Sequence, residues 1–168
     1  MRKLRCLATR VAALDRDIRT AIGADEGLAR RAEVLRSIPG VGPATVASLI
    51  ATMPELGSLD RRAVAAPLGT APWANHSGKH QGRRHVRGGR AAPRRAIHMA
   101  ALAAIRFNPP QRDFYRRLRE AGKEHNVALV AVMRKLVILA NVLLQQGRNR
   151  HRRRSARKRS NAPANLAS

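Results

Sequence analysis

The first apolar residues of the chain recur every three or four positions. This spacing places them on one stripe of an α-helix. The stripe consists of Leu4, Leu7, Val11, Leu14, Ile18 and Ile22. Two heptads and a little more are short for a stable coiled coil, so the pattern predicts a single helix packed on the rest of the protein or one partner of an antiparallel pair. Gly23 and Gly27 weaken or end this helix, and residues 33–37 predict a second short helical piece.

A turn rich in glycine and proline separates the next two helical patterns. Residues 39–42 read Pro-Gly-Val-Gly, Pro43 suits the first turn of a helix, and Pro54 ends that helix. This is the pattern of a helix-hairpin-helix element. Glycine lets backbone N–H groups approach a phosphate, and a helix N-terminus adds a positive dipole end. The candidate phosphate-binding residues are Gly40, Val41 and Gly42. A plain turn between helices that binds no ligand is the alternative.

Further helices are predicted downstream, and no strand pattern stands out. Ser58 predicts the N-cap of a short helix over residues 59–66. Pro93 suits the start of a helix with a face of small residues, and Pro110 suits the first turn of another helix that ends at Gly122. The pattern therefore predicts a mainly α fold.

The last helical pattern is apolar nearly all round. Asn126 predicts its N-cap and Gly147 its end. Arg134 and Lys135 interrupt the apolar run, which favours the central core helix of a globular domain over a membrane span.

Charge adds a partner to this picture. The 168 residues include 34 Lys and Arg against 10 Asp and Glu, a net charge of +24. Self-repulsion at this charge favours a polyanionic partner, with nucleic acid first and ribosome-like RNA or an anionic membrane as rivals. The hydrophobic content of 44% is too high for a wholly disordered tail, and aromatics at 2% disfavour a base-stacking platform. The single cysteine, Cys6, predicts a reducing cytoplasm.

A basic, glycine-rich loop is the main candidate for chemistry. Residues 75–90 read NHSGKHQGRRHVRGGR, and no acidic residue occurs between Asp60 and Asp113. This positive field favours a phosphate and any negative charge that develops beside it, so Ser77 is placed like a nucleophile for a phosphodiester. A loop lying on a phosphate backbone, with Ser77 donating one hydrogen bond, is the alternative. The candidate nucleic-acid-binding residues here are Lys79, Arg83, Arg84, Arg87, Arg90, Arg94 and Arg95.

Metal ligands are not predicted in this chain. The three loop histidines have no carboxylate or thiolate beside them, which disfavours zinc. The acidic residues are scattered and form no Mg²⁺-binding cluster.

Eight Arg and Lys lie within residues 148–159. Such a run does not fold alone, and it predicts a disordered, polyanion-binding tail over residues 148–168. A solvated end without a role is the alternative. The expected organisation is a helical linker over 1–34, a domain over 35–147 and this tail.

The motifs, taken together and in order, resemble the C-terminal half of insertion-sequence transposases of the IS110 (IS116/IS110/IS902) family. The resemblance covers about residues 35–144. The motifs that carry it are IPGVGPATVASLIATMPELG, LGTAPW, SGKHQGRRHVRGGR, HMAALAAIRFNPPQRDFYRRLREAGK and VALVAVMRKLVILANVLL.

The resemblance implies DNA transposition by a serine that becomes covalently linked to a DNA end, here Ser77. It also implies a multimer, a structured bridge RNA, and an N-terminal RuvC-like domain whose four acidic residues bind Mg²⁺. That domain is not in this chain, and residues 1–33 look like the end of the helical linker that follows it. Family members usually carry an apolar residue at Pro67 and at Pro93.

We therefore expect a transposase fragment that binds DNA in the bacterial cytoplasm, near the nucleoid. It holds no cofactor of its own and does not catalyse strand exchange alone. Its partners are DNA, a bridge RNA, and a full-length transposase or a second copy. The alternative is a non-catalytic nucleic-acid-binding protein, either a transposase remnant or an RNA-binding basic protein.

Overall fold

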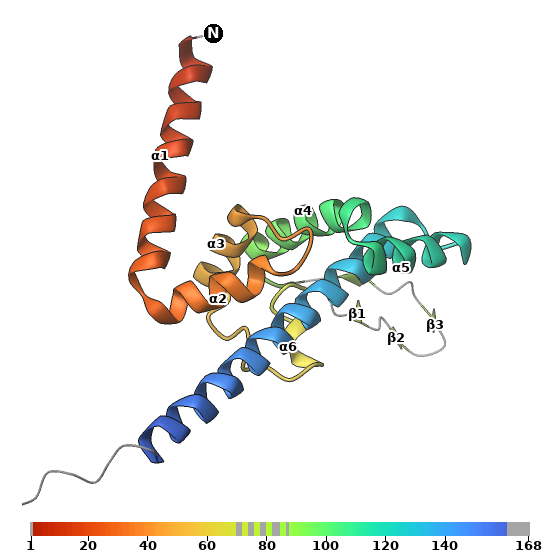
Figure 1. The fold of residues 1–168 in the computed structure, drawn as a ribbon. Coiled ribbons are helices and arrows are strands. Elements are labelled where there is room, and N and C mark those ends of the chain that lie inside the picture. Colours follow the sequence, from red (N-terminus) through yellow and green to blue (C-terminus); the bar gives the residue numbers. More distant parts are fainter. Residues whose placement is uncertain are drawn as a thin grey trace, which may run out of the picture.

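Six α-helices build the described part of the chain in this computed structural model (Figure 1). The structure describes residues 2–69, 72–73, 76–77, 80–81, 85–86 and 88–160; it does not describe the side chains of Arg2, Leu4, the paired segments between 72 and 86, and residues 148–160. The helices are α1 (Arg2–Ala24), α2 (Glu26–Arg36), α3 (Pro43–Thr52), α4 (Ala91–Phe107), α5 (Pro109–Glu120) and α6 (His125–Ser160), with a 3₁₀ turn η1 (Ala63–Ala65). The predicted mainly α fold is confirmed.

Helix α6 is the central element of the core. It contacts α2, α4, α5 and η1, and its inward side chains, among them Val132, Leu136 and Val137, are almost fully buried. Residues 125–147 are long and apolar enough to cross a membrane by length and composition, but half of that apolar stretch is buried inside the fold. The charge of Lys135 lies 4.5 Å from the centre of the Phe114 ring on α5, a cation–π contact. The predicted core helix is confirmed.

Both predicted ends of α6 are wrong. The helix begins at His125, so Asn126 is inside the helix rather than at its cap. The Nδ1 atom of His125 lies 2.7 Å from the Tyr115 hydroxyl on α5. It then continues through Gly147 to Ser160, where a disordered tail was expected from residue 148. One glycine costs a helix only about 1 kcal/mol, and the Gln and Arg residues around it are good helix formers. Residues 161–168 lie outside the described residues.

The turn between α2 and α3 packs against α4. Its Gly40 has a φ of +99°, and a Cβ at this position would lie 2.9 Å from the Cα of Ala104. The Asn108 amide, at the corner between α4 and α5, donates to the Pro39 carbonyl at 3.1 Å. The predicted small-residue face of α4 is confirmed, since Ala100, Ala101 and Ala104 are buried. Close approach of the turn to this face requires glycine at position 40.

We expect Gly40→Ala to destabilise the protein by about 2–4 kcal/mol, because alanine meets both the positive φ and the α4 backbone. The free energy of unfolding in urea measures this loss. The matched control is Gly42→Ala, where φ is −85° and a Cβ meets nothing within 4 Å. The control should cost less than about 1 kcal/mol. Equal losses in the two variants would contradict the packing role of Gly40.

Helix α1 stands away from the other helices over most of its length (Figure 1). Of its apolar stripe, Ile22 is buried against the core, whereas Leu7, Val11, Leu14 and Ile18 are 42–60% exposed. The helix runs past Gly23, and Asp25 then caps α2 by accepting from the Leu28 N–H at 2.9 Å. The second helix is thus longer than predicted. Among the stripe side chains that the structure describes, Ile22 at the C-terminal end is the one buried against the core.

The predicted cap and helix at residues 58–66 are wrong. The structure has only the single turn η1, and Asp60 rather than Ser58 caps it. The Asp60 carboxylate accepts from the N–H groups of Ala63 at 2.8 Å and Arg62 at 2.6 Å, and these bonds hold the pKa of Asp60 below its ordinary 3.8. A lowered carboxyl pKa stabilises the fold above that value, and the contribution disappears as the pH falls through the lowered pKa.

The two unusual prolines fit their positions. Pro93 is the third residue of α4 and is buried; an N–H at this position of a helix has no partner within the helix. Pro67 contributes its carbonyl, which accepts from the backbone N–H of Arg90 at 2.7 Å.

Candidate nucleic-acid interface

Ser77 lies in a small nested hairpin, where no strand was predicted. Strand β1 (Pro72–Trp73) pairs antiparallel with β4 (His85–Val86), and β2 (His76–Ser77) pairs antiparallel with β3 (His80–Gln81). Ser77 stands opposite His80 in this register, at the inner of the two pairs. We call residues 70–87 the serine loop. The predicted loop cations Lys79, Arg83, Arg84 and Arg87 lie outside the described residues.

The two ends of the serine loop meet at a narrow neck, formed by residues 67–69 and 88–90. Gly69, Gly88 and Gly89 all have positive φ, at +62°, +82° and +78°. A Cβ at Gly69 would collide with the Gly88 carbonyl oxygen, and one at Gly89 would collide with the backbone nitrogen of Gly69. The neck therefore needs glycine for its backbone conformation and for the close approach of its two strands.

Two arginines of the predicted site make contacts within the protein at this neck, and the side chain of Arg94 closes it. Arg94 donates from Nε to the Leu68 carbonyl at 2.9 Å and from Nη2 to the carbonyls of Gly89, at 3.1 Å, and of Gly88. The Arg90 Nη1 lies 2.8 Å from the Glu55 carboxylate and also donates to the Thr52 carbonyl. Both guanidinium groups are thus engaged within the protein.

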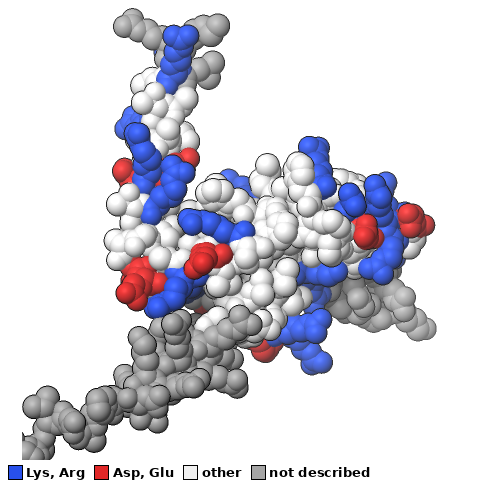
Figure 2. Space-filling model, viewed as in Figure 1, with Lys and Arg blue, Asp and Glu red and all other residues white. Residues whose placement is uncertain are grey.

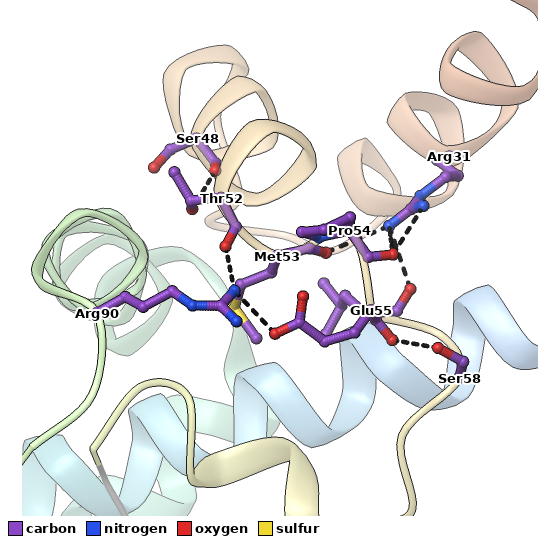
Figure 3. A network of polar contacts seen from close by, with 9 residues as sticks. Arg31, Ser48, Thr52, Met53, Pro54, Glu55, Ser58 and Arg90 are labelled. Carbon is purple, nitrogen blue, oxygen red and sulfur yellow. Dashed lines mark hydrogen bonds and ion pairs between the residues drawn. The ribbon is translucent and has the colours of Figure 1, made fainter.

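The segment that holds Arg90 is itself held by a third arginine, from α2 (Figure 3). Arg31 donates to the Pro54 carbonyl at 3.2 Å, to the Leu56 carbonyl at 3.2 Å and to the Met53 carbonyl at 3.4 Å. Residues 53–56 therefore lie between Arg31 on one side and Arg90 on the other. This bridge connects the helix that precedes the hairpin turn with the neck of the serine loop.

The predicted residues of the hairpin turn have different surroundings. Gly40 is packed on α4, and Val41 is buried with its N–H donating to the Ile38 carbonyl at 3.0 Å. Gly42 is open: it is the N-cap residue of α3 without a side-chain cap, and a Cβ there would meet nothing. A pocket of about 230 Å³ adjoins this helix start, and its lining includes Arg19 and Arg36. The open start of α3 is therefore the accessible part of the turn, and the exposed Arg19 of α1 and Arg36 of α2 lie beside it.

Comparison with known proteins assigns the chain to a family. The family model described as "Transposase IS116/IS110/IS902 family" matches residues 32–116, half of the chain. The chain belongs to this transposase family. It is 34% identical over 116 residues to the insertion element IS110 uncharacterized 43.6 kDa protein of Streptomyces coelicolor, covering 68% of this chain and 29% of that protein.

Two further relatives extend the comparison. The insertion element IS116 uncharacterized 44.8 kDa protein of Streptomyces clavuligerus is 32% identical over 154 residues, 87% of this chain and 36% of that protein. A pilin gene-inverting protein of Moraxella bovis is 28% identical over 139 residues, 80% of this chain and 43% of that protein. The chain thus spans less than half the length of the relatives it matches.

The family match coincides with the elements that surround the serine loop. Residues 32–116 run from α2 through the hairpin turn, α3, residues 53–56, the neck and α4 into α5. The transposase family is therefore recognised on the part of the fold that carries Ser77 and its supports.

A basic row on α5 was left out of the sequence-based site. Arg112, Arg116 and Arg119 follow one another on α5 at intervals of four and three residues, which aligns them along one side of that helix. Lys123 follows in the turn just beyond the end of α5 at Glu120, and we count it with this row. Arg116, Arg119 and Lys123 are exposed, and Figure 2 shows Lys and Arg side chains gathered at this end of the molecule with acidic side chains among them. The helical spacing was the available signal. Arg95 on α4 is also exposed.

The described acidic residues do not fit a magnesium site. Among the described residues, no three His, Cys, Asp or Glu side chains are grouped so that they could hold a metal ion. Glu55 is engaged with Arg90, and Asp60 caps η1. The described residues therefore offer no ligand set for Mg²⁺.

Proposed function

We propose that this chain is the part of an IS110-family transposase that binds DNA and supplies the serine nucleophile, Ser77, for strand cleavage and rejoining. The observation that carries the proposal is the placement of Ser77. It lies on a small hairpin with a closed neck, inside a stretch of more than fifty residues without a carboxylate. That field favours a phosphodiester beside the serine and a negative charge that develops during attack.

The proposed step is a transesterification. The Ser77 Oγ forms a bond with phosphorus, the bond between phosphorus and one DNA oxygen breaks, and the hydroxyl proton leaves the serine as the departing oxygen takes up a proton. The energy of the phosphodiester is kept in the serine–DNA link, so the reverse attack by a DNA hydroxyl rejoins a strand.

Two surfaces support DNA binding through phosphates. One is the hairpin, used as a helix-hairpin-helix: the open N–H groups at Gly42 and the start of α3, with Arg19 and Arg36 beside them. Gly40 and Val41 shape this turn from within. The second is the basic row of α5. Lys79, Arg83, Arg84, Arg87 and Arg95 complete the proposed set around the loop, and a bridge RNA presents the same phosphate chemistry.

The exposed stripe of α1 supports a second partner, another copy of the chain or a longer transposase. Four apolar residues on one helix face are 42–60% exposed in the described part of the chain. The heptad defined by the stripe places Arg10 beside the apolar face. In a dimer, Arg10 of one copy would lie within pairing range of Asp15 or Asp17 of the other copy, which adds charge complementarity. A longer transposase would also supply Mg²⁺-binding acids. The bacterial cytoplasm with its nucleoid is the matching location.

A covalent protein–DNA adduct tests the nucleophile. We expect the chain, mixed with a full-length family transposase and labelled element-end DNA, to form an adduct that survives denaturation, and we expect Ser77→Ala to abolish it. The matched control, Ser37→Ala, removes an exposed serine of the hairpin and should keep the adduct. The measurement is a labelled band on a denaturing gel whose size equals the mass of this chain plus the attached DNA, and which therefore differs from an adduct of the longer partner.

The second candidate function is non-catalytic nucleic-acid binding. The misfit of the described acidic residues to a magnesium site favours this reading for the chain alone. DNA binding with no adduct, even beside the full-length partner, would leave this function in place of the proposed one. Preference for ribosomal RNA over element-end DNA in a competition assay would favour the RNA-binding form.

A further inference from the structure

We propose that Arg31, Glu55 and Arg90 form a positioning bridge that holds the serine loop at a set orientation relative to the DNA-binding hairpin. The inference rests on the proposed function of Ser77, and it concerns residues that do not touch the reacting phosphate. Glu55 and Arg31 were in no sequence-based site, and Arg90 was predicted to bind nucleic acid directly.

The neck makes orientation of the loop depend on a few contacts. The serine loop, residues 70–87, is joined to the rest of the chain at Gly69 and Gly88, whose backbones lie in close contact. Glycines on both sides of the neck give the backbone wide conformational freedom when nothing restrains it. The N–H of Arg90 bonded to the Pro67 carbonyl and the side chain of Arg94 on α4 close the neck, but neither ties it directly to a helix of the hairpin.

The bridge supplies that tie. Arg90, the last residue of the neck, reaches the Glu55 carboxylate and the Thr52 carbonyl at the C-terminal end of α3. On the other side of the same turn, Arg31 from α2 donates to the carbonyl groups of Met53, Pro54 and Leu56 (Figure 3). The two helices of the hairpin and the base of the serine loop are therefore fastened to one five-residue segment. A charged donor in a fork geometry suits such carbonyl clusters.

The partial burial of the ion pair indicates orientation rather than global stability as its role. The side chain of Glu55 is 25% exposed and that of Arg90 is 50% exposed, so water screens part of their attraction. Leu49, Met53 and Leu56 beneath the pair are almost fully buried in the apolar core. Loss of the pair should thus free the neck while the helices stay folded.

The first arm of the test measures loop position without any reaction. In a Cys6→Ser background, spin labels at Ser37→Cys and Ser77→Cys report the distance from the hairpin turn to the loop. We expect a narrow distance distribution in the parent, a broad one after Arg90→Ala or Glu55→Ala, and a narrow one restored by Arg90→Lys. The controls are Arg30→Ala and Glu26→Ala. These residues form an exposed ion pair with the same charges, but both lie on α2, so the distance distribution should stay narrow.

The second arm measures adduct formation by Ser77 at saturating DNA. We expect both Arg90→Ala and Glu55→Ala to slow it by about 10- to 100-fold, because a misplaced nucleophile loses reactivity. The two variants change the net charge in opposite directions. If Arg90 instead bound a DNA phosphate directly, only Arg90→Ala would slow adduct formation, and its affinity for DNA would fall. Glu55→Ala would then bind DNA at least as well as the parent.

The outcomes separate the two proposals. Unchanged distance distributions in Arg90→Ala and Glu55→Ala overturn the bridge, as does a defect confined to Arg90→Ala. Absence of any adduct with the parent protein overturns Ser77 as the nucleophile, and the spin-label arm still decides the bridge. Far-ultraviolet circular dichroism and thermal unfolding of each variant distinguish a freed loop from an unfolded domain.

Discussion

Replacing Leu7 and Leu14 by asparagine should abolish self-association of this chain. Both side chains are about 60% exposed on the stripe of α1, and Val11 and Ile18 extend the same face. A leucine contributes about 1.5–3 kcal/mol on full burial, and a dimer of the variant loses four leucines. We therefore expect the dissociation constant to rise by at least about 10³-fold. Sedimentation equilibrium at about 0.5 M salt, where the repulsion between two highly basic chains is screened, measures it.

The control keeps the same chemistry on another face of α1. Thr9→Asn with Ala12→Asn also introduces two asparagines, so it matches the loss of helix propensity, but these residues lie off the stripe. We expect this variant to associate like the parent. A parent that stays monomeric up to millimolar concentration, or equal weakening in both double variants, would contradict a self-associating stripe. Recovery of association with a longer transposase would then assign the stripe to that partner.

The helices that depend on local patterns could be predicted from the sequence. The stripe of α1, the start of α3 at Pro43 and the small-residue face of α4 all arise from spacing or from proline geometry within one segment. The central place of α6 follows from its apolar composition. Such features need no knowledge of distant residues, because period and turn chemistry act over a few positions.

The helix ends were harder to predict because competing caps lie close together. Asp25 starts α2 several residues before its predicted beginning, and Asp60 takes the role expected of Ser58, whose hydroxyl instead donates to the Glu55 carbonyl at 2.6 Å. At Gly147 the helix formers on both sides prevail over one glycine. In each case the local signals were balanced within about 1 kcal/mol, and sequence patterns do not resolve such differences.

The candidate site shows the same limit at longer range. The charge and glycine content of the serine loop mark it from sequence alone, but the contacts of Arg90 and Arg94 do not follow from charge. Apart from the Glu55 carboxylate, their partners are carbonyls up to 38 residues away, and carbonyls carry no sequence signature. The two glycines of the hairpin also look equivalent in the sequence. Only the approach of Ala104 separates Gly40, which is packed, from Gly42, which is open.

Neutralising the basic row of α5 should sharply reduce the salt dependence of DNA binding. A protein that contacts 6–10 phosphates loses about 10³–10⁵ in affinity between 50 and 200 mM salt, with a slope of about −0.9 per contact. The triple variant Arg116→Gln, Arg119→Gln and Lys123→Gln removes three exposed cations, two from one side of α5 and one from the turn just beyond its end. If each binds one phosphate, the slope of log K against log salt becomes shallower by about 3. Fluorescence anisotropy with labelled duplex DNA at several salt concentrations measures this slope.

A charge-matched variant on α1 separates a contact surface from net charge. Lys3→Gln, Arg5→Gln and Arg16→Gln also remove three exposed cations, but from the helix whose stripe we assign to a protein partner. Counterion release depends on the cations that meet phosphates, so this variant should change the slope by less than about 1. If the two triple variants reduce the slope equally, DNA binding follows overall charge and the α5 row is no specific surface. If only the α1 variant reduces it, the DNA lies along α1, and the assignment of both helices is wrong.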